Sequence, residues 1–362
     1  MYSKLFRRVS LSSFSSVSEV HAAHKPSIFM GALSGESWRH DSMGKTLKHV
    51  TDPNKYVELQ NHAEKNLKNW AQKKLDPPLM VEVVYKDWGL AAQEATRTYG
   101  TAYAVLNMAN SLFPGGAALE GGSAQEENLW HRSTCVRSLL DDIVYLDKES
   151  YLFQYNDVGR ALLEGKAKMT EDELDKLRTV RGDSVTEAYK VFFSPEFRIC
   201  FRGPEVLVPP NMDDTGAGHQ LVADCMMSYV TLPPTHIFPF YELRSAAPEL
   251  ISKSNNWDNQ EVLKQYEMDL RRRIGAQLDT LIVAGQHHVI LGAWGCGAFK
   301  NDPVRVAKIY CEEIEKRAHF FQHILFPIIN TDSHIDNYGV FKKYLTGLKL
   351  NNTDSADPGF KY

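Results

Sequence analysis

Residues 105–135 read VLNMANSLFPGGAALEGGSAQEENLWHRSTC, and this stretch decides the fold. An apolar strand, Thr101–Leu106, precedes two glycine pairs, and Gln125-Glu126-Glu127 then opens a helix. Glycine loops bring backbone N–H groups close to a phosphate, and a helix N-terminus favours negative charge. A phosphate-binding loop followed by an acid is typical of an enzyme that cuts a bond in a nucleotide-like ligand.

The same residues also have an ordinary structural interpretation. Glycine pairs in loops usually form turns. Two glutamates in the first turn of a helix, such as Glu126 and Glu127, usually compensate the helix dipole at the surface. Short patterns of this kind leave both interpretations open.

The segment before this stretch predicts the sheet. Met80–Tyr85 has the composition of a strand, and Gly89–Thr98 that of a short helix before the central strand. Strand, helix and strand at this spacing predict a mostly parallel α/β sheet, which binds ligands at the carboxyl ends of its strands. Asp87, Asn107 and Asn110 follow strands and are therefore candidate ligand-binding residues.

A second glycine loop follows the predicted buried strand His288–Ala293. It precedes a predicted helix, Val304–Ala318, which Asn301 or Asp302 could cap with proline at its first position. Two glycine loops placed between strands and helices can close on one diphosphate from both sides. The candidate residues of this loop are Gly295, Cys296, Gly297, Ala298 and Phe299.

Other segments fill out an α/β pattern. The predicted helices are Asn54–Lys74, residues 124–140 and Trp257–Val283. The predicted strands are Val191–Phe193, Glu205–Val208, Met226–Leu232, Thr235–Tyr241 and Phe321–Ile329.

The domain organisation predicted from composition is one catalytic domain, residues 51–347, with a charged helical insertion at 157–190. Residues 1–50 are expected to be an irregular arm, and residues 348–362 a flexible tail. The first 25 residues are rich in serine and basic residues, which is typical of a transit peptide or of a disordered tail.

Composition excludes several classes of protein. The formal net charge of −4 argues against a general nucleic-acid binder, and no apolar run approaches the length of a membrane span. The five cysteines are widely spaced and predict neither a disulfide framework nor a structural zinc site. We therefore expect no metal or cofactor, no membrane partner, a monomer, and a reducing compartment such as the cytoplasm. Organelle targeting through the N-terminus and delivery into a host cell are the alternatives.

The quoted stretch resembles the signature of the bacterial-type poly(ADP-ribose) glycohydrolases, a branch of the macrodomain superfamily. That signature is Asn-Pro-Gly-Gly-Gly, six to eight residues, then Gln-Glu-Glu. Here Pro114-Gly115-Gly116-Ala117 is followed by seven residues and Gln125-Glu126-Glu127, so Ala117 replaces the third glycine. Residues 291–307, LGAWGCGAFKNDPVRVA, and Ser245-Ala246-Ala247-Pro248 resemble two further blocks of the family.

The resemblance implies a macrodomain-like three-layer α/β/α sandwich with a mixed, largely parallel sheet. It also implies a hydrolase that cuts ADP-ribose from proteins or from poly(ADP-ribose). The family's second glutamate is the acid, which places that role on Glu127 and a supporting role on Glu126. The implied ligand-binding residues are Asp87, Asn107, Asn110, Gly115, Gly116, Ala117, Gln125, Gly295, Cys296, Gly297, Ala298 and Phe299.

Rival interpretations remain for several of these residues. Asp87 could accept the adenine amino group or cap the following helix. Asn107 could contact a ribose or be a satisfied turn residue, and Phe299 could stack on the ligand or belong to the core. For the whole protein, the alternatives are an ADP-ribose reader that does not cut, and a cysteine hydrolase that uses Cys296 with a histidine.

Overall fold

The structure is a computed structural model, and the residues that it describes lie between Glu36 and Asn351. It describes residues 36–110, 115–119, 121–139, 144–146, 153–155, 191–208, 222–250, 259–330 and 336–351. The predicted insertion at 157–190, the basic segment 1–25 and the last eleven residues lie outside the described residues.

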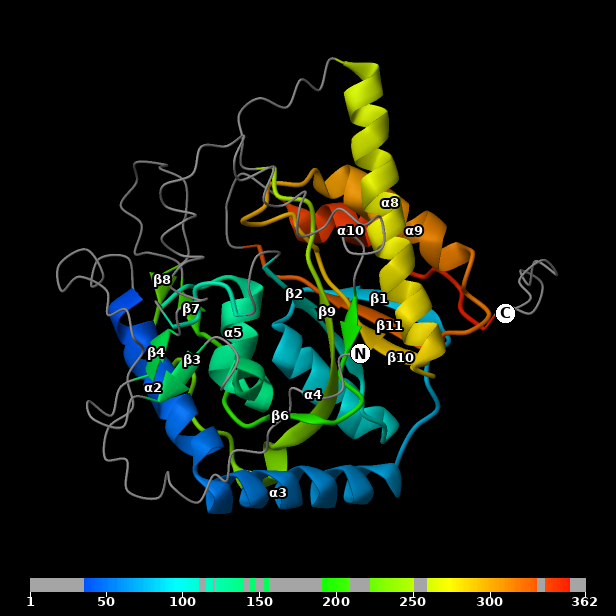
Figure 1. The fold of residues 1–362 in the computed structure, drawn as a ribbon. Helices are drawn as coiled ribbons and strands as arrows, with labels where there is room; N and C mark the ends of the chain where they lie inside the picture. Colours follow the sequence, from blue (N-terminus) through cyan, green and yellow to red (C-terminus); the bar gives the residue numbers. More distant parts are fainter. Residues whose placement is uncertain are drawn as a thin grey trace, which may run out of the picture.

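A seven-stranded sheet forms the centre of the molecule (Figure 1). Its strand order is β1-β11-β10-β2-β9-β5, and β6 also pairs with β9. The pairs from β1 to β9 are parallel, whereas β5 and β6 run antiparallel to β9. The strands are β1 (Met80–Val84), β2 (Ala104–Met108), β5 (Phe192–Phe193), β6 (Arg198–Cys200), β9 (Phe238–Ser245), β10 (His288–Ile290) and β11 (His323–Pro327).

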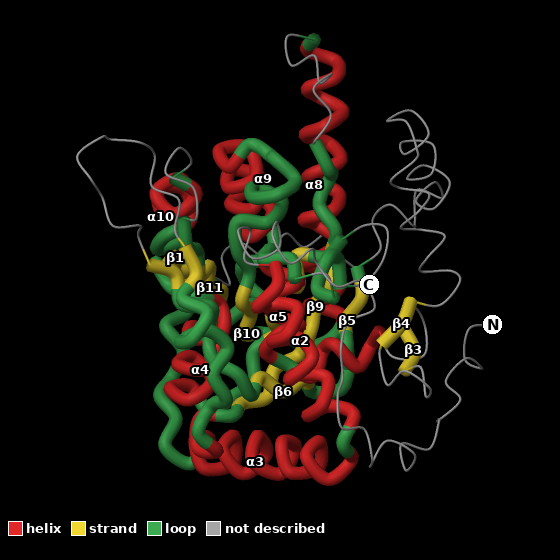
Figure 2. Tube along the Cα trace, turned by 90° about the vertical axis from the view of Figure 1, so that its left-hand side faces the viewer, coloured by secondary structure: helices red, strands yellow, loops and turns green. Residues whose placement is uncertain are grey.

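Helices cover both faces of this sheet, as Figures 1 and 2 show. One layer contains α8 (Gln260–Val283), α9 (Pro303–Glu315) and α10 (Asn337–Leu345), which share one buried apolar cluster. The other contains α2 (Glu36–Thr51), α3 (Pro53–Ala71), α4 (Trp88–Tyr99) and α5 (Gln125–Arg132), which share a second cluster. The predicted three-layer α/β/α sandwich with a mixed, largely parallel sheet is therefore confirmed.

Short elements complete the described chain. They are the 3-10 helices η2 (Thr134–Leu139) and η3 (Pro234–His236), and the strand pairs β3 (Val144–Leu146) with β4 (Phe153–Tyr155) and β7 (Leu207–Val208) with β8 (Val222–Ala223).

Local sequence explains where the helices around the site begin. Asp302 caps α9 by accepting from the Val304 N–H at 2.8 Å, and Pro303 occupies the first turn, as predicted. Asp87 caps α4 in the same way, and that helix ends at Gly100 in the left-handed conformation.

Residues 36–50 were expected to be irregular, and that expectation is wrong because they form α2. Met43, Leu47 and Val50 give this helix a buried apolar face. His40 and Thr46 are also fully buried, and their polar groups bond to distant parts of the chain. The alternation of apolar and buried polar residues obscures the helical period in the sequence.

The expected strand at Met226–Leu232 is also wrong. The Asp224 side chain accepts from the Met226 and Met227 N–H groups, which fixes a turn there. The side chains of both methionines project into solvent.

Two other boundaries differ from expectation. The helix predicted over residues 124–140 ends at Arg132, because Ser133 is extended and bridges to Cys200 of β6. The tail begins later than residue 348, since the Leu350 N–H donates to the Leu79 carbonyl and the Leu350 side chain is buried.

Candidate active site

Three neighbouring parallel strands end at one place in the fold. β10, β2 and β9 lie side by side, so their carboxyl ends share one edge of the sheet. The Ser245 carbonyl at the end of β9 accepts from the Ala109 N–H after β2 at 3.2 Å. It also accepts from Trp294 Nε1 after β10 at 2.9 Å. The residues that begin the two predicted glycine loops therefore bond to the same carbonyl, that of Ser245 in the motif Ser245-Ala246-Ala247-Pro248.

Two carboxylates line the first glycine loop. A Cβ atom on Gly116 would lie 2.3 Å from Glu127 Oε1 and 3.4 Å from Glu126 Oε2, and Gly116 has a φ of 52°. Glycine is therefore required here both for its backbone conformation and because both acids approach the main chain. Gly122 is constrained by space alone, since its Cβ would lie 2.8 Å from the Ala117 Cβ.

The first acid, Glu126, is fully engaged. Its Oε1 atom accepts from the Gly115 N–H at 2.9 Å and from Arg244 Nη2 at 3.0 Å. Its Oε2 atom accepts from the Asn110 N–H at 2.6 Å. Burial raises the pKa of Glu126 to about 7, although Arg244 and the two backbone donors act in the opposite direction. Glu126 thus ties the first loop and the end of β2 to β9.

The second acid, Glu127, has a different environment. Its Oε1 atom accepts from the Ala117 N–H at 2.9 Å, but its buried Oε2 atom has no hydrogen-bond partner among the described residues. Burial raises the pKa of this carboxyl, and the Ala117 N–H opposes the effect. A protonated carboxyl places its hydrogen on an oxygen that faces no donor. Glu127 Oε2 meets that requirement, so this group can serve as an acid.

Gln125 joins the start of α5 to the end of β2. Its Oε1 atom accepts from the Met108 N–H at 2.8 Å, and its Nε2 atom donates to the Leu106 carbonyl at 2.9 Å. The side chain thereby satisfies two backbone groups at the strand's end and fixes where the acid-bearing helix begins. Gln125 was predicted as a ligand-binding residue, and these contacts give its amide a structural role.

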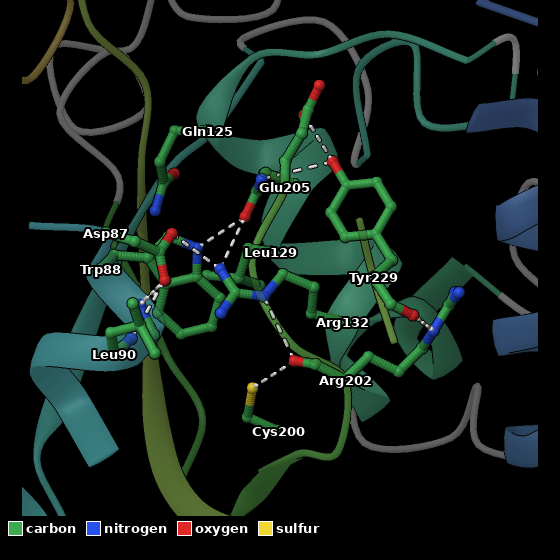
Figure 3. A network of polar contacts seen from close by, with 12 residues as sticks. Asp87, Trp88, Leu90, Gln125, Leu129, Arg132, Cys200, Arg202, Glu205 and Tyr229 are labelled. Atoms are coloured by element: carbon green, nitrogen blue, oxygen red, sulfur yellow. Dashed lines mark hydrogen bonds and ion pairs between the residues drawn. The ribbon is translucent and has the colours of Figure 1, made fainter. Parts of the chain in front are cut away.

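Asp87 belongs to the network drawn in Figure 3. Its Oδ1 atom accepts from the Gly89 and Leu90 N–H groups, which confirms the capping interpretation. Its Oδ2 atom accepts from Arg132 Nη1 at 2.8 Å. Contact with an adenine amino group remains a prediction, and both carboxylate oxygens already have partners.

A series of hydrogen bonds leads from the Asp87–Arg132 ion pair through α5 to residues that follow β6 in the chain. Arg132 Nη1 also donates to Asn128 Oδ1 at 3.0 Å, and Asn128 Nδ2 donates to the Tyr229 hydroxyl at 3.3 Å. The Tyr229 hydroxyl in turn donates to Glu205 Oε2 at 2.8 Å (Figure 3). The helix that carries Glu126 and Glu127 is therefore fixed at both of its ends.

The two candidate asparagines have different positions. Asn107 is completely buried in β2, where its Nδ2 atom donates to Glu242 Oε1 at 2.8 Å. Asn110 lies beyond the strand and holds Glu126 through its backbone N–H. The interpretation of Asn107 as a turn residue is wrong, because it lies within the strand. A ribose contact stays a prediction for both residues.

An amide side chain holds the second glycine loop. Asn301 Nδ2 donates to the Gly295 and Pro248 carbonyls at 3.0 and 2.8 Å, and Asn301 Oδ1 accepts from the Tyr266 hydroxyl at 2.9 Å. A Cβ on Gly295 would lie 2.5 Å from the Ala247 Cβ, and its φ is 73°. Gly297 and Ala298 are exposed at the tip of the loop, and a Cβ on Gly297 would meet nothing within 4 Å.

Cys296 lies beneath this tip and not at its surface. Its thiol donates to the Trp294 carbonyl at 3.5 Å, and burial raises the thiol pKa well above its usual range. These properties are those of a structural cysteine and argue against its use as a nucleophile. Phe299 is partly buried and packs against the apolar cluster under α8 and α9, in agreement with the core interpretation.

Sequence reasoning missed Arg244 and the role of Asn301. Arg244 stands directly before the motif Ser245-Ala246-Ala247-Pro248, so its position beside the predicted site was the signal available in the sequence. Among the described residues, no group of three or more His, Cys, Asp and Glu side chains could hold a metal ion. None of the described helices has the length and apolarity of a membrane span.

Residues 39–159 match the family model described as the catalytic domain of microbial-type PARG, the poly(ADP-ribose) glycohydrolases. The predicted resemblance to the bacterial-type PARG family is confirmed. The matched segment contains the first glycine loop and both acids, and the second loop lies outside it. No curated protein matches the chain.

Solved PARG structures cover most of this chain. The PARG of Thermomonospora curvata is 20% identical, covers 85% of this chain and 99% of its own, and gives a TM-score of 0.51. The PARG of Deinococcus radiodurans in complex with ADP-ribose is 23% identical, covers 78% and 90%, and gives a TM-score of 0.46. At such identities, the likeness to the Thermomonospora structure shows a shared macrodomain-like fold.

Proposed function

We propose that this protein is an ADP-ribosyl glycohydrolase in which Glu127 is the general acid. The proposal rests on the different environments of the two oxygens of the buried Glu127 carboxylate. Oε1 accepts a hydrogen bond from the Ala117 N–H, whereas Oε2 has no hydrogen-bond partner among the described residues. The match of residues 39–159 to the microbial-type PARG catalytic domain supplies the substrate class. The substrate is ADP-ribose joined through its ribose to a protein or to another ADP-ribose.

The chemistry follows from the site's geometry. Cleavage of a ribose glycosidic bond passes through an oxocarbenium-like transition state, and the leaving oxygen must be protonated. A carboxyl whose pKa is raised by burial retains its proton closer to neutral pH. Glu127 gives that proton to the leaving oxygen and, once ionised, accepts a proton from the attacking water. Glu126 holds the first glycine loop in a fixed position relative to Glu127.

The diphosphate would bind between the two glycine loops. In the first loop, the N–H groups of Gly115 and Ala117 already donate to Glu126 and Glu127. We therefore assign the phosphate contacts mainly to the exposed tip of the second loop, Gly297 and Ala298. A bound diphosphate places negative charge beside the acids, which favours the protonated form of Glu127.

The decisive experiment measures release of free ADP-ribose by the wild type, Glu127→Gln and Glu126→Gln. Poly(ADP-ribose) and a mono-ADP-ribosylated protein serve as parallel substrates, and calorimetry measures ADP-ribose binding by each variant. We expect Glu127→Gln to bind ADP-ribose like the wild type and to lose about 10²–10⁴-fold in turnover, the usual contribution of general acid–base catalysis. The preferred wild-type substrate then identifies the linkage class.

Other outcomes reject parts of this proposal. A wild type that binds ADP-ribose without cutting either substrate would be a reader of ADP-ribose. Full activity in Glu127→Gln would move the acid elsewhere. Absence of ADP-ribose binding by the wild type would leave the glycine loops as structural turns.

A further inference from the structure

Arg244 is the residue of β9 that reaches the acid pair. It is the last residue before Ser245 at the strand's end, and its backbone lies beside Asn107 of β2. Its Nη2 atom lies 3.0 Å from Glu126 Oε1 in an ion pair whose two side chains are 16% and 2% exposed. Its guanidinium lies 5.7 Å from the Trp130 ring centroid, so α5 packs against it as well.

The donors around Glu126 favour the ionised carboxylate. Oε1 accepts from the Gly115 N–H and from Arg244, and Oε2 accepts from the Asn110 N–H. An ionised carboxylate has about four acceptor sites and three of them are taken here, so each of these N–H groups stabilises the anion and a proton on Oε1 would displace one of them. Arg244 is the only member of this set that carries a charge, because the other two donors are backbone amides.

Glu127 lies beside this ionised group. Both acids approach the same point on Gly116, so the two carboxylates are close together. Two neighbouring carboxylates do not ionise independently, and the charge on one favours the proton on the other. Among the described residues, the charged groups that affect the pKa of Glu126 are Arg244 of β9 and Glu127 of α5.

We propose that Arg244 is a positioning residue that holds Glu126 as an anion and so confines the proton of the pair to Glu127. The proposal rests on the proposed function for its catalytic consequence. Its structural part, that Arg244 controls the ionisation of Glu126, does not depend on the protein having enzymatic activity. Loss of Arg244 would let Glu126 take up the proton, break its bonds to the loop, and leave Glu127 with a weaker hold on its own proton.

The test measures the ionisation of the Glu126 and Glu127 carboxyl groups directly. Wild-type protein, Arg244→Met and Arg244→Lys are labelled with glutamate carrying carbon-13 at the side-chain carboxyl, and carbon resonances are followed against pH. Glu126→Gln and Glu127→Gln assign the two signals. In the wild type we expect Glu126 to ionise at a lower pH than Glu127. In Arg244→Met we expect the Glu126 titration to move about 1–3 pH units higher, the usual effect of losing an adjacent positive charge, and Arg244→Lys should retain most of the wild-type behaviour.

Turnover on the better substrate is measured over the same pH range. We expect the acidic limb of kcat to move to higher pH with the Glu126 signal in Arg244→Met, while KM changes little. Arg198→Met is the matched control, because Arg198 forms a comparably buried ion pair with Glu242 of the same strand, at 3.1 Å. It should change stability without moving either the Glu126 signal or the pH profile.

The proposal fails if wild-type Glu127 ionises before Glu126, a result that needs no variant to fold. It also fails if the Glu126 titration of folded Arg244→Met matches that of the wild type, or if Arg198→Met moves it equally. A wild type without glycohydrolase activity would overturn the proposed function alone, since the carbon signals decide the role of Arg244 separately.

Discussion

The two glycine loops occupy equivalent places in the fold but are held by opposite kinds of chemistry. Each follows a parallel strand and precedes a helix. The loop after β2 is held by two buried carboxylates, Glu126 and Glu127, whereas the loop after β10 is held by the neutral amide of Asn301. The first loop is therefore held by groups that can bind protons, whereas the second is held by a side chain that does not titrate. In the function proposed above, the reaction takes place at the first loop and the second loop binds phosphate.

The largest expected effect is a pH dependence of stability that originates in the first loop. Because burial raises the pKa of Glu127, and that of Glu126 to about 7 from 4.5, the carboxyl pair of the folded protein holds a proton between these pH values that the unfolded chain has released. Its stability therefore falls as pH rises through that window, by roughly 3 kcal/mol in total. Urea unfolding at pH 5 and pH 7 should show this loss in the wild type and not in the double variant Glu126→Gln/Glu127→Gln. Equal pH dependence in both proteins would contradict it.

Gly116→Ala should damage the first loop next most severely. The new methyl group needs the space of Glu127 Oε1, which lies 2.3 Å from the Cβ position. Displacing a catalytic group by about 1 Å can cost about 10²-fold in rate, so turnover should fall by about that factor. Calorimetric ADP-ribose binding serves as the control for folding. Wild-type turnover in this variant would mean that the acid's position is unimportant.

Asn301→Ala tests the neutral loop. It removes the donor to the Gly295 and Pro248 carbonyls and the Oδ1 atom to which the Tyr266 hydroxyl donates. We expect a loss of about 1–3 kcal/mol in the free energy of unfolding, equal at pH 5 and pH 7 because no titrating group is removed. A strongly pH-dependent loss would place an ionisable group in the second loop as well.

Gly297→Ala should have the smallest effect on stability. A methyl group at this position meets nothing within 4 Å, so the free energy of unfolding should change by less than about 0.5 kcal/mol. If the tip binds phosphate, ADP-ribose affinity measured by calorimetry should nevertheless decrease. Unchanged affinity would remove the tip from the proposed diphosphate site.

Much of this arrangement is local and could be predicted from the sequence. Asp302 with Pro303 marks the start of α9, and the two glycine loops and their flanking strands follow from short patterns. The interaction of Glu126 with Arg244 could not be predicted, because the two residues are 118 positions apart and meet only through the order of the strands. α2 was missed for a similar reason: buried His40 binds the Leu119 carbonyl, 79 positions away.

The order of strands in the sheet also has a consequence for how the chain reaches its folded state. β1 and β2 come first in the sequence, but β11 and β10 lie between them, and β2 pairs with β9 and β10. Among the described residues, every sheet partner of the first two strands thus begins 130 or more residues after the end of β2. A fragment limited to residues 39–159 would contain both acids and neither strand's neighbours. Because long-range pairing slows folding, the nascent chain keeps these strand edges exposed until its second half has been synthesised, and exposed edges are prone to aggregation during that interval.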